Sequence, residues 1–321
     1  MAACDHSTTA PKPSAVGFDD PAGIVAVVSA VESTFATPAL RSFSALRPLF
    51  VIPGAPASAV RSEPAACAAQ QSLAPMRSGP IPDSVVRRVF YYEPTASSYL
   101  ASADSSGPLG GVRFLLYQTD SIGGLRMPLL TDGWFDLVDQ GAGGFTGSIR
   151  GSAGAGADYT ITPSGTQTNY RMLMAGSVTN GTRSLTFRDS TTTAYVQVGS
   201  VVTLQAGGAQ IDLNATRAAL DAYDGFYDVD FKLANATDTA RIYGSITTYC
   251  LISTTSLRIA VRGTDYAEVV TGSNGPVIVR LDKQPLDDAQ AQAMWSLIRV
   301  QSELFDWMQA FFMPARQLLP P

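Results

Sequence analysis

The stretch Ala194–Asn214, AYVQVGSVVTLQAGGAQIDLN, decides the fold class of this chain. On both sides of Gly207-Gly208, apolar residues largely alternate with polar ones, as in two strands that each bury one face. Two successive glycines suit the turn between them, because the central residues of a tight hairpin need positive φ. The stretch therefore predicts an antiparallel hairpin.

The same period of two extends in both directions, over residues 85–282. Further turn signals stand at Asn180-Gly181, Asp224-Gly225 and Asn274-Gly275. The expected strands cover 89–92, 98–100, 111–119, 133–139, 145–151, 158–163, 169–179, 183–189, 194–206, 209–214, 227–234, 239–253, 256–262, 266–271 and 276–282. Short strands joined by tight turns predict a mainly β protein, an antiparallel meander that forms a curved, partly open barrel or a sandwich.

Both ends of the chain change to a helical period. Asp19-Asp20-Pro21 and Thr37-Pro38 are helix-start signals, and they predict two amphipathic helices within residues 21–50. Near the C-terminus, apolar residues at helical spacing predict a helix over 286–313 that ends before Pro314. The Pro-rich stretch 53–83 is expected to be a loop, and residues 21–321 to form one domain.

Composition limits the classes of function. The chain has 321 residues, only 15% of them charged, and a formal net charge of −5. Lys occurs only at Lys12, Lys232 and Lys283, so no clustered basic surface for nucleic acid is expected. No apolar run reaches the roughly 18–20 residues that a membrane helix needs.

The sequence offers no recognisable catalytic machinery. The only histidine, His6, lies in the N-terminal stretch, so we expect no Ser-His-Asp site, no metal site, no cofactor and no enzyme activity. Acidic residues flank aromatic ones in two places, where they could bind a sugar, cleave a glycoside or hold Ca²⁺. A solvated strand face with turn residues explains them more simply. They are Asp132, Asp136, Asp139, Asp221, Asp224, Asp228 and Asp230.

The N-terminal residues Met1-Ala2-Ala3-Cys4 resemble the lipobox of bacterial lipoproteins. The resemblance implies a lipid on Cys4, a flexible tether over residues 1–20, and a place in the bacterial cell envelope, in the periplasm or at the outer membrane. The pattern departs from the family because the charged and apolar regions of a signal peptide do not precede Cys4. The interpretation therefore requires either a start upstream of Met1 or a segment that has been clipped.

Two cysteines remain, Cys67 and Cys250. In an oxidising envelope they could form a disulfide. Alternatively, they are two isolated, small apolar residues.

Methionine and aromatic residues are the remaining candidates for a binding site. Ten of them could line an apolar cavity, or simply form the core: Tyr91, Phe114, Trp134, Tyr170, Met172, Met174, Trp295, Phe305, Met308 and Phe312. The expected order of elements is similar to that of envelope lipoproteins with an unclosed β-barrel covered by helices, such as the LolA/LolB lipoprotein carriers.

That resemblance implies a non-enzymatic, lipid-anchored protein that binds a hydrophobic small molecule or acyl chain between sheet and helices. Two alternatives stay open. One is a structural or surface assembly protein with a filled core. The other is a glycan-active enzyme that uses the Asp residues.

Overall fold

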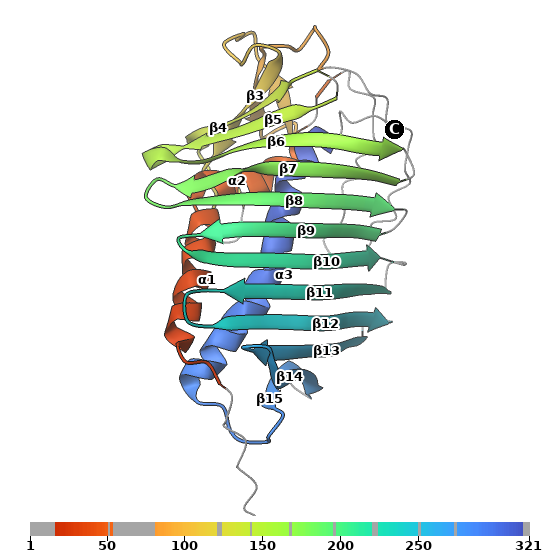
Figure 1. Cartoon of the computed structure of the whole chain (residues 1–321). Coiled ribbons are helices and arrows are strands. Elements are labelled where there is room, and N and C mark those ends of the chain that lie inside the picture. Colours follow the sequence, from red (N-terminus) through yellow and green to blue (C-terminus); the bar gives the residue numbers. More distant parts are fainter. Residues whose placement is uncertain are drawn as a thin grey trace, which may run out of the picture.

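One continuous sheet makes up most of the molecule. The computed structural model describes residues 17–50, 52–53, 81–120, 124–141, 143–166, 169–194, 197–219, 224–249, 252–272 and 275–316. Within them, the fifteen strands follow the order β15-β14-β13-β12-β11-β10-β9-β8-β7-β6-β5-β4-β3-β1-β2, and the sheet is not closed (Figure 1). This confirms a mainly β, partly open architecture; the two layers of a sandwich are not formed.

The strands are longest in the middle of the sheet. Their bounds are β1 Val89–Glu93, β2 Ser98–Ala101, β3 Gly111–Tyr117, β4 Thr131–Asp139, β5 Phe145–Gly151, β6 Ala155–Thr166, β7 Asn169–Asn180, β8 Ser184–Ala194, β9 Gln197–Ala206, β10 Ala209–Ala219, β11 Gly225–Ala234, β12 Thr239–Tyr249, β13 Ile252–Val261, β14 Thr264–Gly272 and β15 Gly275–Arg280.

From β3 to β15 every strand pairs with its neighbours in the sequence, antiparallel, as the turn signals predict. The β9–β10 pair places Ala206 opposite Ala209, with Gly207 and Gly208 at φ 55° and 92° in the turn. The first strands differ from the expected meander. β1 pairs parallel with β3, with Val89 opposite Arg113, so β2 becomes the edge of the sheet.

Three α-helices and a short 3₁₀ turn, η1 Arg47–Leu49, accompany the sheet. The helices are α1 Pro21–Phe35, α2 Pro38–Leu46 and α3 Asp288–Arg316, and a second 3₁₀ turn, η2 Ser152–Gly154, lies between β5 and β6. As predicted, Pro occupies the first turn of α1 and of α2, and Asp20 caps α1 by accepting a hydrogen bond from Gly23 N–H. Pro314 lies inside α3, so the prediction that the helix ends before it is wrong.

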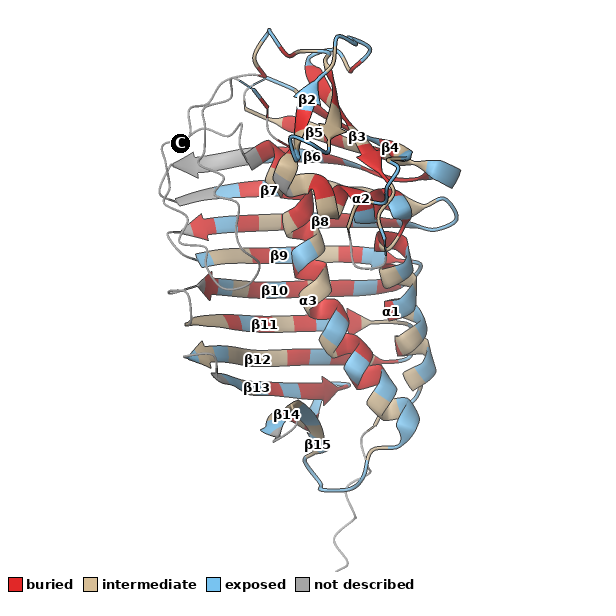
Figure 2. Ribbon diagram, turned by 180° about the vertical axis from the view of Figure 1, so that it is seen from behind, coloured by how far each residue is buried: buried red, intermediate tan, exposed pale blue. Residues whose placement is uncertain are grey.

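The helices cover only one face of the sheet, which we call the inner face; the other is the open face (Figure 2). Alternation along each strand sends apolar side chains inward, as in Leu185 and Phe187 of β8 or Phe231 and Leu233 of β11, all buried. One core cluster extends from Phe18 to Ala315 and joins the sheet to the three helices.

Phe311 of α3 is a central member of this core. Its ring lies 6.1 Å from that of Phe35, 5.9 Å from Phe43, 5.0 Å from Tyr159 and 5.5 Å from Phe187, so it contacts α1, α2 and two strands.

In the part of the chain that the structure describes, no single helix is long and apolar enough to cross a membrane. The α1–α2 pair meets those criteria together but is bent by 64°.

Candidate binding groove on the open face of the sheet

A groove of about 790 Å³ lies on the open face, across β9 to β14. Its lining, which we call the open-face groove, consists of Val201, Val202, Thr203, Asp212, Leu213, Asn214, Asp230, Lys232, Thr239, Arg241, Tyr243, Ala260, Gly263 and Asp265. Val202 and Leu213 are inner-face residues, so they reach the groove with their backbone. The volume lies within the usual range of roughly 300–1,000 Å³ for ligand sites.

Local irregularity shapes one end of the groove. The β13–β14 register shifts between Ile259 and Ala260, and a shift of this kind bends a strand and redirects its side chains. Arg262 and Gly263 then make the turn with φ of 50° and 79°. No atom lies within 4 Å of the Cβ position of Gly263, so this residue leaves open space at the end of the groove.

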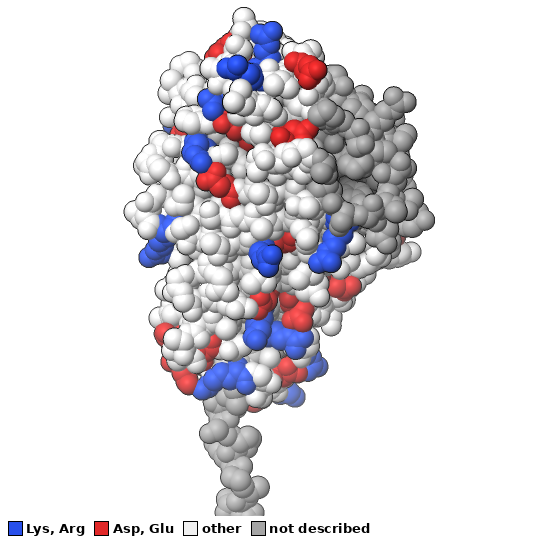
Figure 3. Space-filling view, turned by 45° about the horizontal axis from the view of Figure 1, so that its top comes forward, with Lys and Arg blue, Asp and Glu red and all other residues white. Residues whose placement is uncertain are grey.

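Charged side chains of both signs alternate across the groove. Arg241 in β12 donates from Nε and Nη2 to the two carboxylate oxygens of Asp230 in β11, at 2.7 Å each. The same guanidinium lies 4.7 Å from the ring centre of Tyr243. Figure 3 shows acidic and basic side chains next to one another on this face.

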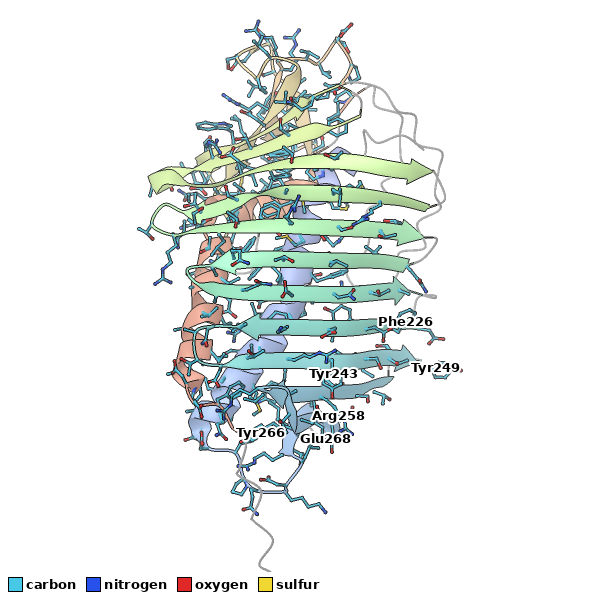
Figure 4. All side chains as sticks on the ribbon, in the orientation of Figure 1. Phe226, Tyr243, Tyr249, Arg258, Tyr266 and Glu268 are labelled. Atoms are coloured by element: carbon cyan, nitrogen blue, oxygen red, sulfur yellow. The ribbon has the colours of Figure 1, made fainter. Side chains whose placement is uncertain are left out.

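The network continues into β13 and β14. Tyr243 donates its hydroxyl to Asp265 at 2.6 Å, and Arg258 Nη1 donates to the other oxygen of that carboxylate at 3.4 Å. Figure 4 labels Tyr243 and Arg258 on neighbouring strands. Hydrogen bonding to Asp230 raises the pKa of Arg241, and hydrogen bonding to Asp265 raises the pKa of Tyr243. Arg241 therefore stays cationic and Tyr243 stays neutral over the physiological range.

The acidic residues singled out in the sequence do not converge on one site. Asp228 and Asp230 share the open face of β11, and Asp230 lines the open-face groove. Asp136 pairs with Arg113 on the same face, many strands away, at 2.7 Å. Burial raises the pKa of Asp132 at the start of β4. Asp139 Oδ1 accepts a hydrogen bond from the backbone N–H of Gly141 in the turn after β4. Asp224 directly precedes β11, and Asp221 lies outside the described residues.

The structure does not bring together all the residues predicted to line an apolar cavity. Met172 and Met174 of β7, Met308 and Phe312 of α3, and Phe114 of β3 are buried members of the one core. Phe305 of α3 is also buried, but it packs against Tyr227 of β11, at 5.8 Å between ring centres. Tyr91 and Trp134 lie near the β2 end of the sheet, Trp134 37% exposed and stacked by Arg113, while Trp295 is 40% exposed on α3. The side chain of Tyr170 lies outside the described part.

The three cysteines, Cys4, Cys67 and Cys250, also lie outside the described residues, so lipidation and the disulfide remain predictions. No group of three or more His, Cys, Asp or Glu side chains suited to a metal ion occurs in the described ranges.

Sequence reasoning missed most of the open-face groove and a polar cluster on the inner face. Asp189, Thr191 and Ser200 are buried beneath α3 with 3%, 2% and 0% exposure. The available signal was the phase of β8, because Asp189 and Thr191 continue the inward series of Leu185 and Phe187.

Comparisons with known proteins do not add to this picture. No family model, no curated protein and no solved structure matches the chain. The class that fold and site define is therefore that of an open, one-sided β-sheet covered by helices, with a polar groove on its bare face.

Proposed function

We propose that this chain is a non-enzymatic binding protein that holds a hydroxyl-rich ligand, a glycan, in the open-face groove. The observation that carries the proposal is the alternation of Asp and Arg or Lys side chains across the groove. A hydroxyl group both donates and accepts hydrogen bonds, so it can bind a carboxylate and a guanidinium at once.

The charges of the groove favour a neutral ligand over an ion. Three lining residues are acidic, Asp212, Asp230 and Asp265, and two are basic, Lys232 and Arg241. An anion would meet the carboxylates, and a cation would meet the guanidinium and the amine. Tyr243 adds an aromatic ring on which the apolar face of a sugar can pack.

Binding to a glycan array, followed by calorimetry on the best soluble oligosaccharide, tests the proposal. We expect Tyr243→Ala and Arg241→Ala each to weaken binding by roughly tenfold or more, as loss of a central contact does. Arg150→Ala is the matched control, because it breaks the Arg150–Asp158 pair on the same face outside the groove. Binding that is absent, or equally affected by the control, contradicts the proposal.

A second candidate is an apolar ligand between the sheet and α3. Its support is that the core between the sheet and the helices contains methionines on both sides, Met172 and Met174 on β7 and Met308 on α3. The near-zero exposure of these side chains equally suits the structural alternative with a filled core. Native mass spectrometry of the purified chain separates the two, because a carrier is expected to retain an amphiphile and a filled core is not.

We also propose that Cys4 is lipidated and that the domain is attached to a membrane of the cell envelope. The support is the resemblance of Met1-Ala2-Ala3-Cys4 to a lipobox. Residues 17–20, the first that the structure describes, are held to the domain by side chains of two turns. Asp238 accepts the backbone N–H groups of Asp19 and Asp20, and Arg262 pairs with Asp19 and donates to the Gly17 carbonyl. Intact mass of protein extracted from membranes, compared with Cys4→Ser, tests for the lipid.

A further inference from the structure

A carboxylate lies in the apolar layer between the sheet and α3. Asp189 of β8 is 3% exposed and points to the inner face. Its neighbours in register are Met174 of β7 and Val202 of β9. An acidic group at such a place is costly to bury as an ion unless hydrogen bonds stabilise it.

Two hydroxyl groups provide those hydrogen bonds. Ser200 Oγ donates to Asp189 Oδ1 at 2.6 Å, and Thr191 Oγ1 donates to Oδ2 at 2.9 Å. Thr191 Oγ1 in turn accepts a hydrogen bond from Gln309 Nε2 of α3, at 3.3 Å. The carboxylate is therefore linked through one hydroxyl to the helix above it.

Asp189 lies between two contacts that join β8 to α3. On one side along the strand is the Thr191–Gln309 hydrogen bond. On the other, the ring of Phe187 stacks on that of Phe311 at 5.5 Å. A change in the charge of Asp189 is therefore expected to weaken or strengthen the packing of β8 against the C-terminal half of α3.

No charged side chain offsets the carboxylate among its described neighbours. Met174 faces it from β7, Val202 and Ser200 from β9, and Gln309 from α3. Near Gln309 along α3, Asp306 pairs with Arg217 of β10. Burial raises the pKa of Asp189 to about 6, and the hydrogen bonds from Ser200, Thr191 and the backbone N–H of Ser190 oppose that rise only in part.

The direction of the pH effect follows from this. When α3 covers β8, which we call the closed state, the pKa of Asp189 lies above the ordinary value of 3.8. The closed state therefore favours the neutral acid over the carboxylate. The stability that neutral Asp189 gives to the closed state is fully present below about pH 4, and it is lost as pH rises through about 6.

We propose that the contact of α3 with β8 is a pH-sensitive seam, which loosens when Asp189 ionises and uncovers an apolar surface that contains methionine. On the sheet side this surface includes Met174, which lies opposite Asp189 in register, and Met172, which lies opposite Thr191, and both are buried. Such a surface suits an amphiphile, because methionine adapts to varied apolar shapes. The seam is independent of the open-face groove.

Hydrogen exchange of the full chain tests the seam. After correction for intrinsic rates, backbone amides in residues 301–316 are expected to open about tenfold more readily at about pH 7.5 than at about pH 5, with a midpoint near 6. Asp189→Asn, which keeps the size of the side chain, is expected to abolish the difference. Asp228→Asn, on the exposed face of β11, is the control and is expected to leave it unchanged.

A second readout is the fluorescence of the apolar dye ANS, which is expected to rise with pH in the unaltered chain and not in Asp189→Asn. Three results of the exchange experiment would overturn the proposal. They are exchange that does not depend on pH, a pH midpoint of exchange near 4, and greater opening at acidic pH. The midpoint in the unaltered chain decides the matter even if Asp189→Asn does not fold. Thr191→Val then provides a second variant, in which loss of one hydrogen bond is expected to move the midpoint upward.

Discussion

Asp238 shows how much one buried side chain can organise. It is 1% exposed in the turn between β11 and β12, yet its two oxygens accept the backbone N–H groups of Asp19 and Asp20 at 3.3 and 2.7 Å. Without it, these N–H groups lose their protein partner at the point where α1 begins. The carboxylate thereby connects the first helix to a turn more than two hundred residues away in the sequence.

We expect Asp238→Ala to lower the free energy of unfolding by about 2–3 kcal/mol, because donors to a charged acceptor are left unpaired. Urea denaturation measures the change. Asp228→Ala, an exposed acidic residue in the neighbouring β11, is expected to stay within about 0.5 kcal/mol of the original. Equal losses in the two variants would show that the contact at α1 contributes nothing.

Two glycines make room for the side chain of Tyr159, a requirement that the neighbouring sequence of each glycine does not reveal. Gly147 of β5 and Gly176 of β7 lie on either side of Tyr159 in β6, and a Cβ on Gly147 would come within 2.2 Å of the Tyr159 ring. We expect Gly147→Ala to destabilise the fold by about 1–3 kcal/mol through overpacking, as measured by thermal unfolding. Gly199→Ala in β9 is the comparison for loss of a strand glycine without a clash, since the nearest atom lies 3.6 Å from its Cβ position and its φ is not positive.

Among the residues of the candidate sites, sequence reasoning found Asp230 but neither Arg241 nor Tyr243. Arg241 lies opposite Lys232 in register, and it pairs with Asp230 only because the two long side chains of neighbouring strands meet on one face. Such pairing depends on register, which alternation alone does not encode. Asp189 was missed for a different reason, since a carboxylate in a Ser/Thr-rich strand is expected to face water.

At the scale of elements, helix starts and hairpins were predictable because their signals are local. Asp20 with Pro21 and Thr37 with Pro38 begin α1 and α2 where expected. The parallel pairing of β1 with β3 was not predictable, because nothing in a five-residue strand specifies a partner across an intervening hairpin strand. The continuation of α3 past Pro314 depends on packing, since Pro314 and Ala315 are buried against the core.

Phe311 should be the most sensitive position of α3. We expect Phe311→Ala to cost about 3–5 kcal/mol, because a fully buried ring in contact with α1, α2, β6 and β8 leaves a cavity. Trp295→Ala on the exposed side of the same helix is the matched control and should cost far less. Urea midpoints of the two variants compare them directly. A similar loss in both would indicate that α3 acts through helical propensity rather than through its buried face.

At the scale of the whole molecule, α3 crosses the strands of the inner face and joins them into one core (Figure 2). We therefore expect one cooperative unfolding transition rather than separate melting of the two ends of the sheet. Trp134 in β4 and Trp295 near the start of α3 report on opposite ends (Figure 1).

Single-tryptophan variants test this cooperativity. The chain contains three tryptophans, so two Trp→Phe changes leave either Trp134 or Trp295 as the only reporter. Coincident urea transitions are expected from the two variants. Two separate midpoints would instead assign the β1–β5 end and the β11–β15 end to independent units.

The order of the strands has a consequence for biosynthesis. Since nearly every strand pairs with the one made just before it, the sheet can assemble step by step while the nascent chain is still growing. The C-terminal helix, Asp288–Arg316, is translated last, after α1, α2 and every strand. Until then only α1 and α2 can cover the apolar face, so we expect the growing polypeptide to expose apolar surface that α3 buries once the ribosome finishes.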